Sequence, residues 1–254
     1  MQAPGSDTEG KEYASPSEMW AAESGDDAKR AQWYSKAVEY WAAQPESYDG
    51  VLGGFGHVSP VEIRDSAAFL KKVFAGPLKD AKEGKRRLRC IDCGAGVGRV
   101  SAELLLYHFQ EVDLLEPVEK LLKKAEETLS RGGKWPSAHN AGRYLCQGLQ
   151  EFAPEPEIYD VVWIQWALLY LTDEDCQTLF DRCRVGLKKD GIVVVKENIC
   201  REGFIVDKSD SSLTRSDAYM LDLFARCGVQ VIENVKQKNF PRDLFDVRMY
   251  ALKL

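Results

Sequence analysis

The segment Leu88–Arg99, with the sequence LRCIDCGAGVGR, constrains the fold more than any other part of the chain. A short apolar run ends at Asp92 and is followed by three alternating glycines, Gly94, Gly96 and Gly98. Glycines at this spacing let the backbone turn tightly after a strand, so that N–H groups and the start of the next helix come close to a ligand. The segment therefore predicts a strand, a ligand-binding turn and a helix, in that order.

An acidic residue at the end of the next apolar stretch points to an adenosine ligand. Glu116 ends the stretch VDLLE, and a carboxylate at this place can accept hydrogen bonds from both ribose hydroxyls. The glycine spacing is G-x-G-x-G-R, not the G-x-G-x-x-G of dinucleotide sites, which bind a pyrophosphate. S-adenosylmethionine has no pyrophosphate, and its carboxylate can pair with Arg99. The pattern favours S-adenosylmethionine, with S-adenosylhomocysteine as product, over a nicotinamide cofactor.

Strands and helices alternate after the glycine motif. This alternation is typical of an α/β fold with a mostly parallel sheet, and the last two strands, joined only by a loop, indicate an antiparallel end. We expect a Rossmann-like sheet of seven strands with helices on both faces and extra N-terminal helices. The strands are predicted at 89–93, 111–116, 143–147, 159–165, 191–197, 229–237 and 246–254, and the main helices at 100–107, 118–129 and 173–187.

The chain before the glycine motif divides into two parts. Residues 1–28 are rich in Ser, Gly, Pro, Ala and Glu with little periodic apolar content, so a disordered tail is predicted there. Residues 29–254 are predicted to form one domain, in which 29–78 make an N-terminal helical lid. The segment DGVLGGFGH at 49–57 has the backbone freedom that a lid or a close approach to a ligand requires.

Composition excludes several classes of function. The net charge of −6 argues against non-specific nucleic-acid binding, which depends on Lys and Arg that neutralise phosphates. Apolar runs long enough to cross a bilayer do not occur, so no membrane association is expected. The seven cysteines are scattered, and no second C-x-x-C or His pair completes a metal site with Cys90 and Cys93. We expect free thiols, no metal, and a reducing compartment, the cytosol or the nucleus.

Further ligand contacts are expected at the ends of later strands. Leu149 and Gln150 follow the third predicted strand, where a backbone amide and a side-chain amide can bind the adenine edge. The fourth strand, YDVVWIQW, ends in Gln165 and Trp166 at the sheet edge where ligands bind. A buried glutamine needs hydrogen-bonding partners, which favours a ligand contact for Gln165. For Trp166, core packing stays an equal alternative.

Together these stretches resemble the α-N-terminal protein methyltransferase family, a branch of the seven-strand S-adenosylmethionine-dependent methyltransferases. IDCGAGVGR, CQGLQEF and VVWIQW carry the likeness in the cofactor half. YSKAVEYW (34–41), DGVLGGFGHVS (49–59) and VKENICREGFIVDKSDSSL (195–213) make it specific, because a generic methyltransferase does not require them. The family methylates the free α-amino group that removal of the initiator Met exposes, typically at an X-Pro-Lys terminus.

The resemblance implies a set of site residues. Asp210 would bind the substrate ammonium and accept a proton, and Asn198 would orient the amine. Asp207 would pair with the Lys at substrate position three, and Trp166 would pack on the substrate proline. The implied cofactor contacts are Trp41, Gly94, Gly96, Arg99, Glu116, Pro117, Val118, Leu149, Gln150 and Gln165. The implied substrate contacts are Leu52, Gly53, Trp166, Tyr170, Asp207 and Ser212.

Two positions depart from the family pattern. Tyr170 stands where the family often has His, which leaves the proton acceptor open, and Phe245 stands where a Tyr is usual. Two other functions stay open: a methyltransferase for a small molecule or another protein group, and a catalytically silent protein that only binds the cofactor. A protein or peptide N-terminus is the expected partner, and a monomer is the expected state.

Overall fold

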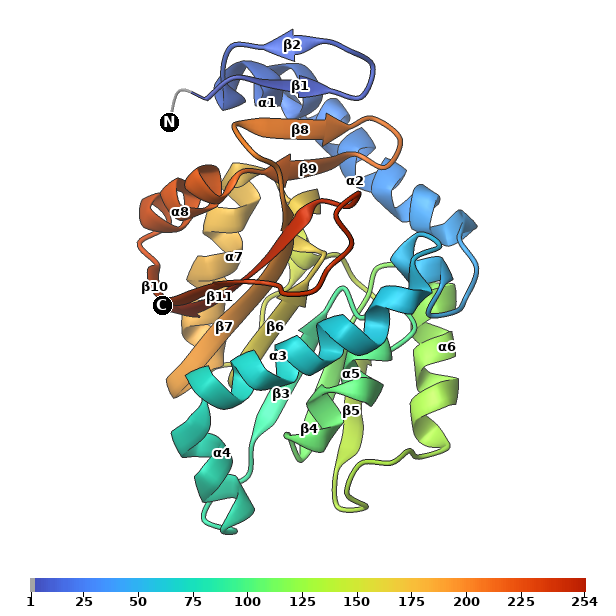
Figure 1. Cartoon of the computed structure of the whole chain (residues 1–254), viewed down its shortest axis with the longest axis vertical. Coiled ribbons are helices and arrows are strands. Elements are labelled where there is room, and N and C mark those ends of the chain that lie inside the picture. Colours follow the sequence, from blue (N-terminus) through green and yellow to red (C-terminus); the bar gives the residue numbers. More distant parts are fainter. Residues whose placement is uncertain (1–2) are drawn as a thin grey trace.

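A seven-stranded sheet forms the centre of the protein in the computed structural model, which describes residues 3–254 (Figure 1). The strand order is β10-β11-β7-β6-β3-β4-β5, and only β11 runs against its neighbours. The predicted mostly parallel sheet with an antiparallel final strand is therefore confirmed. The strands are β3 (Arg89–Cys93), β4 (Glu111–Leu115), β5 (Asn140–Leu145), β6 (Tyr159–Gln165), β7 (Leu187–Ile199), β10 (Gln230–Lys236) and β11 (Asp246–Lys253).

Helices connect most of these strands, with boundaries that differ somewhat from the predicted ones. The predicted helix at 100–107 is α5 (Arg99–Glu103) followed by a 3-10 turn at Leu105–Tyr107. A helix at 217–226 had no counterpart in the sequence analysis. The remaining helices are α2 (Asp27–Ala43), α3 (Ser59–Val73), α4 (Ala75–Lys82), α6 (Glu119–Ser130), α7 (Asp173–Gly186) and α8 (Asp217–Arg226).

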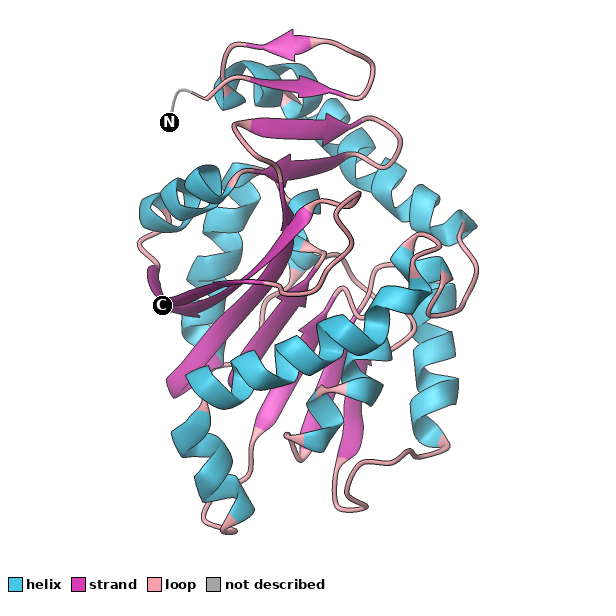
Figure 2. Cartoon of the chain, in the orientation of Figure 1, coloured by secondary structure: helices cyan, strands magenta, loops and turns pink. Residues whose placement is uncertain are grey.

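The central strands send their side chains alternately into two apolar cores. In β3, Ile91 and Cys93 pack with residues of α7 and α8, whereas Cys90 packs with residues of α3, α5 and α6. Figure 2 shows α3 and α5 crossing the near face of the sheet. Because both faces are covered, the strands are apolar on both sides, and the sequence shows them as continuous apolar runs.

The expectation of a disordered tail at 1–28 is wrong for the residues that the structure describes. Two short strands, β1 (Gly5–Asp7) and β2 (Glu12–Tyr13), and a helix, α1 (Pro16–Ser24), precede α2. They join a hairpin, β8 (Phe204–Asp207) and β9 (Ser212–Arg215), in a second sheet of order β2-β1-β8-β9 (Figure 1). Met1 and Gln2 lie outside the described residues.

The N-terminal segment owes its order to apolar side chains that the composition obscured. Tyr13 and Met19 are 2% and 0% exposed, and they pack with Trp33 of α2 and with Phe204 and Val206 of β8. The partner strand β8 is far away in the chain, so the composition of residues 1–28 alone could not predict this contact. Helix α1 begins at Ser15, whose hydroxyl accepts a hydrogen bond from the Glu18 N–H at 3.2 Å.

The helices expected in the N-terminal lid, 29–78, are present as α2, α3 and α4, with two 3-10 turns between α2 and α3 at Gly50–Leu52 and Gly56–Val58. Opening and closing of this region stays a prediction. Among the helices of residues 3–254, none combines the length and the apolar character needed to cross a membrane.

Replacing Met19 by Ala tests whether the N-terminal segment belongs to the folded unit. We expect the free energy of unfolding to fall by about 2–5 kcal/mol, because a fully buried side chain leaves a cavity. Urea denaturation measures it. Ser17→Ala on the exposed side of the same helix is the control, with an expected change within about 0.5 kcal/mol. Equal effects of the two substitutions would contradict the packing.

Candidate functional site

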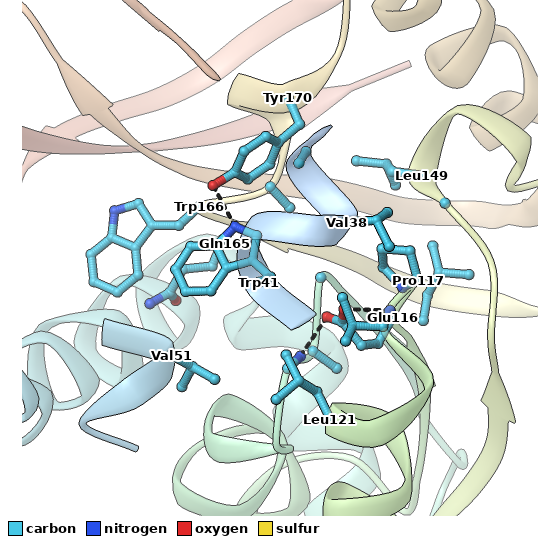
Figure 3. A pocket seen from close by; sticks show the side chains of 18 of the residues that line it. Val38, Trp41, Val51, Glu116, Pro117, Leu121, Leu149, Gln165, Trp166 and Tyr170 are labelled. Atoms are coloured by element: carbon cyan, nitrogen blue, oxygen red, sulfur yellow. Dashed lines mark hydrogen bonds between the residues drawn. The ribbon is translucent and has the colours of Figure 1, made fainter. Parts of the chain in front are cut away.

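A cavity opens where the carboxyl ends of β3, β4 and β6 meet (Figure 3). The space between its walls, including the part open to solvent, is about 1050 Å³. Figure 3 shows Val38 and Trp41 of α2, and Val51 of the following turn, facing the residues at the strand ends. Ligands of parallel α/β sheets bind at this edge, so the cavity is the candidate cofactor site.

The glycine turn packs tightly against two neighbouring strand ends. The backbone N–H groups of Gly94 and Ala95 both donate to the Leu115 carbonyl at the end of β4, at 2.8 and 3.0 Å. Gly94 has φ of 76°, and a Cβ added to it would lie 2.6 Å from the Cβ of Ala167. The turn therefore needs glycine both for its left-handed backbone and for lack of space.

Glu116 lies at the floor of the cavity as a buried carboxylate. Its Oε2 accepts a hydrogen bond from the Gly96 N–H at 2.8 Å, and its Oε1 accepts one from the Val118 N–H at 2.9 Å (Figure 3). Burial raises the pKa of Glu116 to about 7, although these two N–H groups lower it. Each carboxylate oxygen has a second lone pair, so the group can still accept hydrogen bonds from a ligand.

A cluster of buried charges lies beside the cavity around Glu62 of α3. Lys196 Nζ donates to Glu62 Oε2 at 2.7 Å, Gln165 Nε2 donates to the same oxygen at 3.0 Å, and the Arg99 guanidinium pairs with Oε1. Burial raises the pKa of Glu62, but the charges of Lys196 and Arg99 outweigh it and lower the pKa overall. Two cations thus share the Glu62 carboxylate, and two further carboxylates act on them, Asp92 on Arg99 and Asp65 on Lys196.

The turn after β6 holds Trp166 in an uncommon conformation. Trp166 has φ of 52°, and its indole Nε1 donates to the Asn198 side-chain carbonyl at 3.0 Å. Glu197 Oε1 supports the turn, because it accepts the N–H groups of Ala167 and Leu168 at 2.9 and 2.8 Å. Burial raises the pKa of Glu197 to about 8, against the effect of these N–H groups.

A chain of hydrogen bonds leads from the cavity to the acidic loop between β8 and β9. The Trp41 indole Nε1 donates to the Tyr170 hydroxyl at 2.7 Å (Figure 3). This hydroxyl in turn donates to Asp210 Oδ2 at 3.0 Å. Asp210 Oδ1 accepts the Ser212 N–H at 3.1 Å. Asp210 is 9% exposed, and burial raises its pKa, while the hydrogen bonds from Ser212 and Tyr170 lower it.

Comparison with known proteins assigns the family. A family model described as AdoMet dependent proline di-methyltransferase matches residues 29–253. The chain belongs to this family. A protein of Arabidopsis thaliana named alpha N-terminal protein methyltransferase 1 is 44% identical, over 99% of this chain and 91% of its own.

Two further relatives of this methyltransferase support the assignment. The Xenopus laevis protein named N-terminal Xaa-Pro-Lys N-methyltransferase 1-B is 38% identical, over 87% of this chain and 96% of its own. A solved structure from Leishmania major, described as a SAM-dependent methyltransferase, is 38% identical and covers 100% of this chain and 97% of that one, with a TM-score of 0.87. The fold and the dependence on S-adenosylmethionine are those of the family.

The structure brings together all the residues that the sequence predicted as cofactor contacts of this methyltransferase. All of them line the cavity: Trp41, Gly94, Gly96, Arg99, Glu116, Pro117, Val118, Leu149, Gln150 and Gln165. Arg99 and Gln165 also bind Glu62, which the sequence analysis did not anticipate. Their roles toward the cofactor stay predictions.

The predicted substrate residues are spread over three segments beside the cavity. Trp166 and Tyr170 line the cavity itself, and Asn198 and Asp210 contact these two side chains. Asp207 ends β8 directly opposite the first residue of β9. The other predicted contacts are Ser212 at that first position of β9, and Leu52 and Gly53 in the turn after α2, next to cavity-lining Val51.

Sequence reasoning missed the residues that support the site from behind, namely Glu62, Lys196 and Glu197. Lys196 and Glu197 follow the apolar run IVVV of β7 directly and are 0% and 2% exposed. Charged residues that continue a buried strand are a usable signal, because they need partners inside the protein. Glu62 is 0% exposed in an amphipathic helix, where its spacing gave no such signal.

We expect Glu116 to make the affinity for the cofactor depend on pH. Ribose hydroxyls bind the ionised carboxylate better, so cofactor binding should lower the Glu116 pKa from about 7 and release a proton. Affinity should rise as the pH increases, by about tenfold between about pH 6 and about pH 8. Calorimetry in two buffers of different ionisation enthalpy measures it. In Glu116→Gln, affinity should be weaker and independent of pH, and an unchanged pH dependence would refute the assignment.

Proposed function

We propose that this protein transfers the methyl group of S-adenosylmethionine to the free α-amino group of protein N-termini that begin X-Pro-Lys. Its family and the names of its Arabidopsis and Xenopus relatives support the proposal. The observation that carries it is the link from Trp41 through Tyr170 to Asp210, because it joins an acidic loop to the cofactor cavity. A carboxylate there suits a cationic chain terminus.

The residues around the cavity fit the cofactor. Glu116 would hold the ribose, Leu149 and Gln150 would bind the adenine edge, and Arg99 would face the carboxylate. When bound, S-adenosylmethionine supplies an electrophilic methyl group on a sulfonium and leaves as S-adenosylhomocysteine. The protein's part is to orient the amine, exclude water and take up a proton.

The amine must be neutral to attack, and an unperturbed α-amino group has a pKa of about 7.7–8.0. Asp210 is our candidate for the group that binds the ammonium and accepts its proton. Tyr170 is not, because burial and then the Asp210 carboxylate raise the pKa of its phenol well above the ordinary value. Tyr170 therefore stays protonated and acts as a hydrogen-bond donor, so Asp210 takes the role that the sequence left open.

The remaining contacts would align the peptide. Asn198 would hold the amine through its side-chain carbonyl, which already accepts from Trp166 and has a second lone pair. Trp166 would pack on the proline ring, and Asp207 would pair with the Lys at position three. A small-molecule acceptor would have no use for Asp207 and Asp210 at two ends of one loop.

Labelled S-adenosylmethionine and a Ser-Pro-Lys peptide, with the N-terminus free or acetylated, test the proposal. Label is expected on the free peptide only. Label on both peptides would mean methylation of the lysine side chain, and label on neither would mean another acceptor or no catalysis. Either result contradicts the proposed function.

Replacing Asp210 by Asn should lower turnover of the free peptide by at least about 100-fold, because a general base is lost. Cofactor affinity, measured by calorimetry, should change less than about twofold, since Asp210 lies beyond Tyr170 from the cavity. Asp207→Asn is the matched variant: it should raise the peptide KM and leave turnover at saturation largely intact. Comparable losses of turnover and cofactor affinity in Asp210→Asn would show that Asp210 does not have the proposed role of general base.

A further inference from the structure

The N-terminal segment 3–28 precedes the family match, yet it is built onto the hairpin that carries the acidic loop. Strand β1 pairs in parallel with β8, from Gly5 opposite Phe204 to Asp7 opposite Val206. The pairing continues past the strands, because the Thr8 N–H donates to the Val206 carbonyl at 3.0 Å. The segment is therefore positioned to act on the loop at 208–211.

The acidic loop contains a cation of its own. Lys208 directly follows Asp207 and stands two residues before Asp210 in the sequence DKSDSS. A lysine has a long flexible stem with a compact charge at its end. The ammonium already acts on the Asp7 carboxylate, and without Glu23 it could also pair with either aspartate of the loop and take the place of the substrate's own cations.

The N-terminal segment holds Lys208 on the opposite face of the hairpin. Side chains alternate along β8, so Val206 packs in the N-terminal cluster and Asp207 faces the other way. Lys208 follows the strand, and its ammonium binds Glu23 Oε2 of α1, a helix that packs in the same cluster as Val206. The Lys208 backbone N–H donates to Thr8 Oγ1 at 3.0 Å, so the N-terminal segment holds both the backbone and the side chain of Lys208.

Glu23 is itself fixed in place. The Tyr13 hydroxyl donates to Glu23 Oε1 at 2.8 Å, and Tyr13 is 2% exposed. The side chains of Glu23 and Lys208 are 12% and 25% exposed. A pair shielded to this degree is screened less by solvent than an ion pair on the open surface.

We infer that the N-terminal segment is a specificity element: Glu23 keeps the Lys208 ammonium away from Asp207 and Asp210, so that these carboxylates can pair with the cationic terminus and lysine of the substrate. This inference rests on the proposed function and adds to it a positioning residue outside the region that the family model matches. Glu23 and Lys208 act through the two aspartates and do not touch the substrate.

The inference is tested in the full-length protein by asking whether Lys208→Met reverses the effect of Glu23→Gln. Glu23→Gln should raise the KM for a free Ser-Pro-Lys peptide about fivefold, as expected for loss of a partly shielded charge interaction. The KM for S-adenosylmethionine should not change, and kcat should stay within about twofold. Lys208→Met in the Glu23→Gln background should restore the peptide KM to the wild-type value, because the competing cation is gone.

A purely structural role of Glu23 predicts a different result, namely that the double variant is as impaired as Glu23→Gln or more so. That outcome, or an unchanged peptide KM in Glu23→Gln, would overturn the inference. Glu9→Gln, which removes an exposed carboxylate from the turn after β1, is the control and should leave all parameters unchanged. If the wild-type protein methylates no free peptide, the proposed function itself fails; if only the suppression fails, the proposed function stands.

Discussion

The close packing of the glycine turn against the ends of β4 and β6 is the constraint on which the rest of the site depends. One carbonyl, that of Leu115, accepts two N–H groups from the turn, and a side chain at Gly94 would collide with Ala167. Because these strand ends are drawn together, Glu116 and Gln165 face the same cavity from different strands. Gly94 is needed both because a side chain would not fit and because the backbone is left-handed. The resulting tight turn forms one wall of the site at the sheet edge where the parallel strands end.

Buried charge gives this site its electrostatic character. Burying the charges of Lys196 and Arg99 away from water is costly, and their hydrogen bonds to Glu62 offset that cost. Lys196 also donates to the Ser66 hydroxyl at 2.8 Å. Arg99, the one of these two cations that lines the cavity, is therefore held in a fixed position before any ligand binds.

The substrate side is assembled from pieces of the chain that meet only in three dimensions. Tyr170 joins Trp41 of α2 to Asp210 of the β8–β9 loop, and the N-terminal strand pairs with that hairpin from its other side. Burial raises the pKa of the Tyr170 phenol well above its ordinary value, so this group is a hydrogen-bond donor. In the proposed function the proton of the amine goes to Asp210, whose pKa burial raises.

The sequence by itself determined the α/β fold, the strand order along the chain, and the residues around the cofactor cavity, because glycine turns, apolar runs and strand-end polar residues are local signals. It did not reveal the second sheet, since β1 and β8 are separated by most of the chain and their pairing leaves no local pattern. Nor did it reveal that Glu62, Lys196 and Glu197 support the site. Charged residues directly after the apolar run of β7 signal that Lys196 and Glu197 need partners, but only the structure shows that Glu62 is the partner of Lys196. Only the tertiary structure shows that Asp210 is the aspartate beside Tyr170, and that Glu23 binds Lys208 in place of its acidic neighbours. The physical reason is that side-chain partners depend on distances in space, which the spacing of residues in the sequence does not fix.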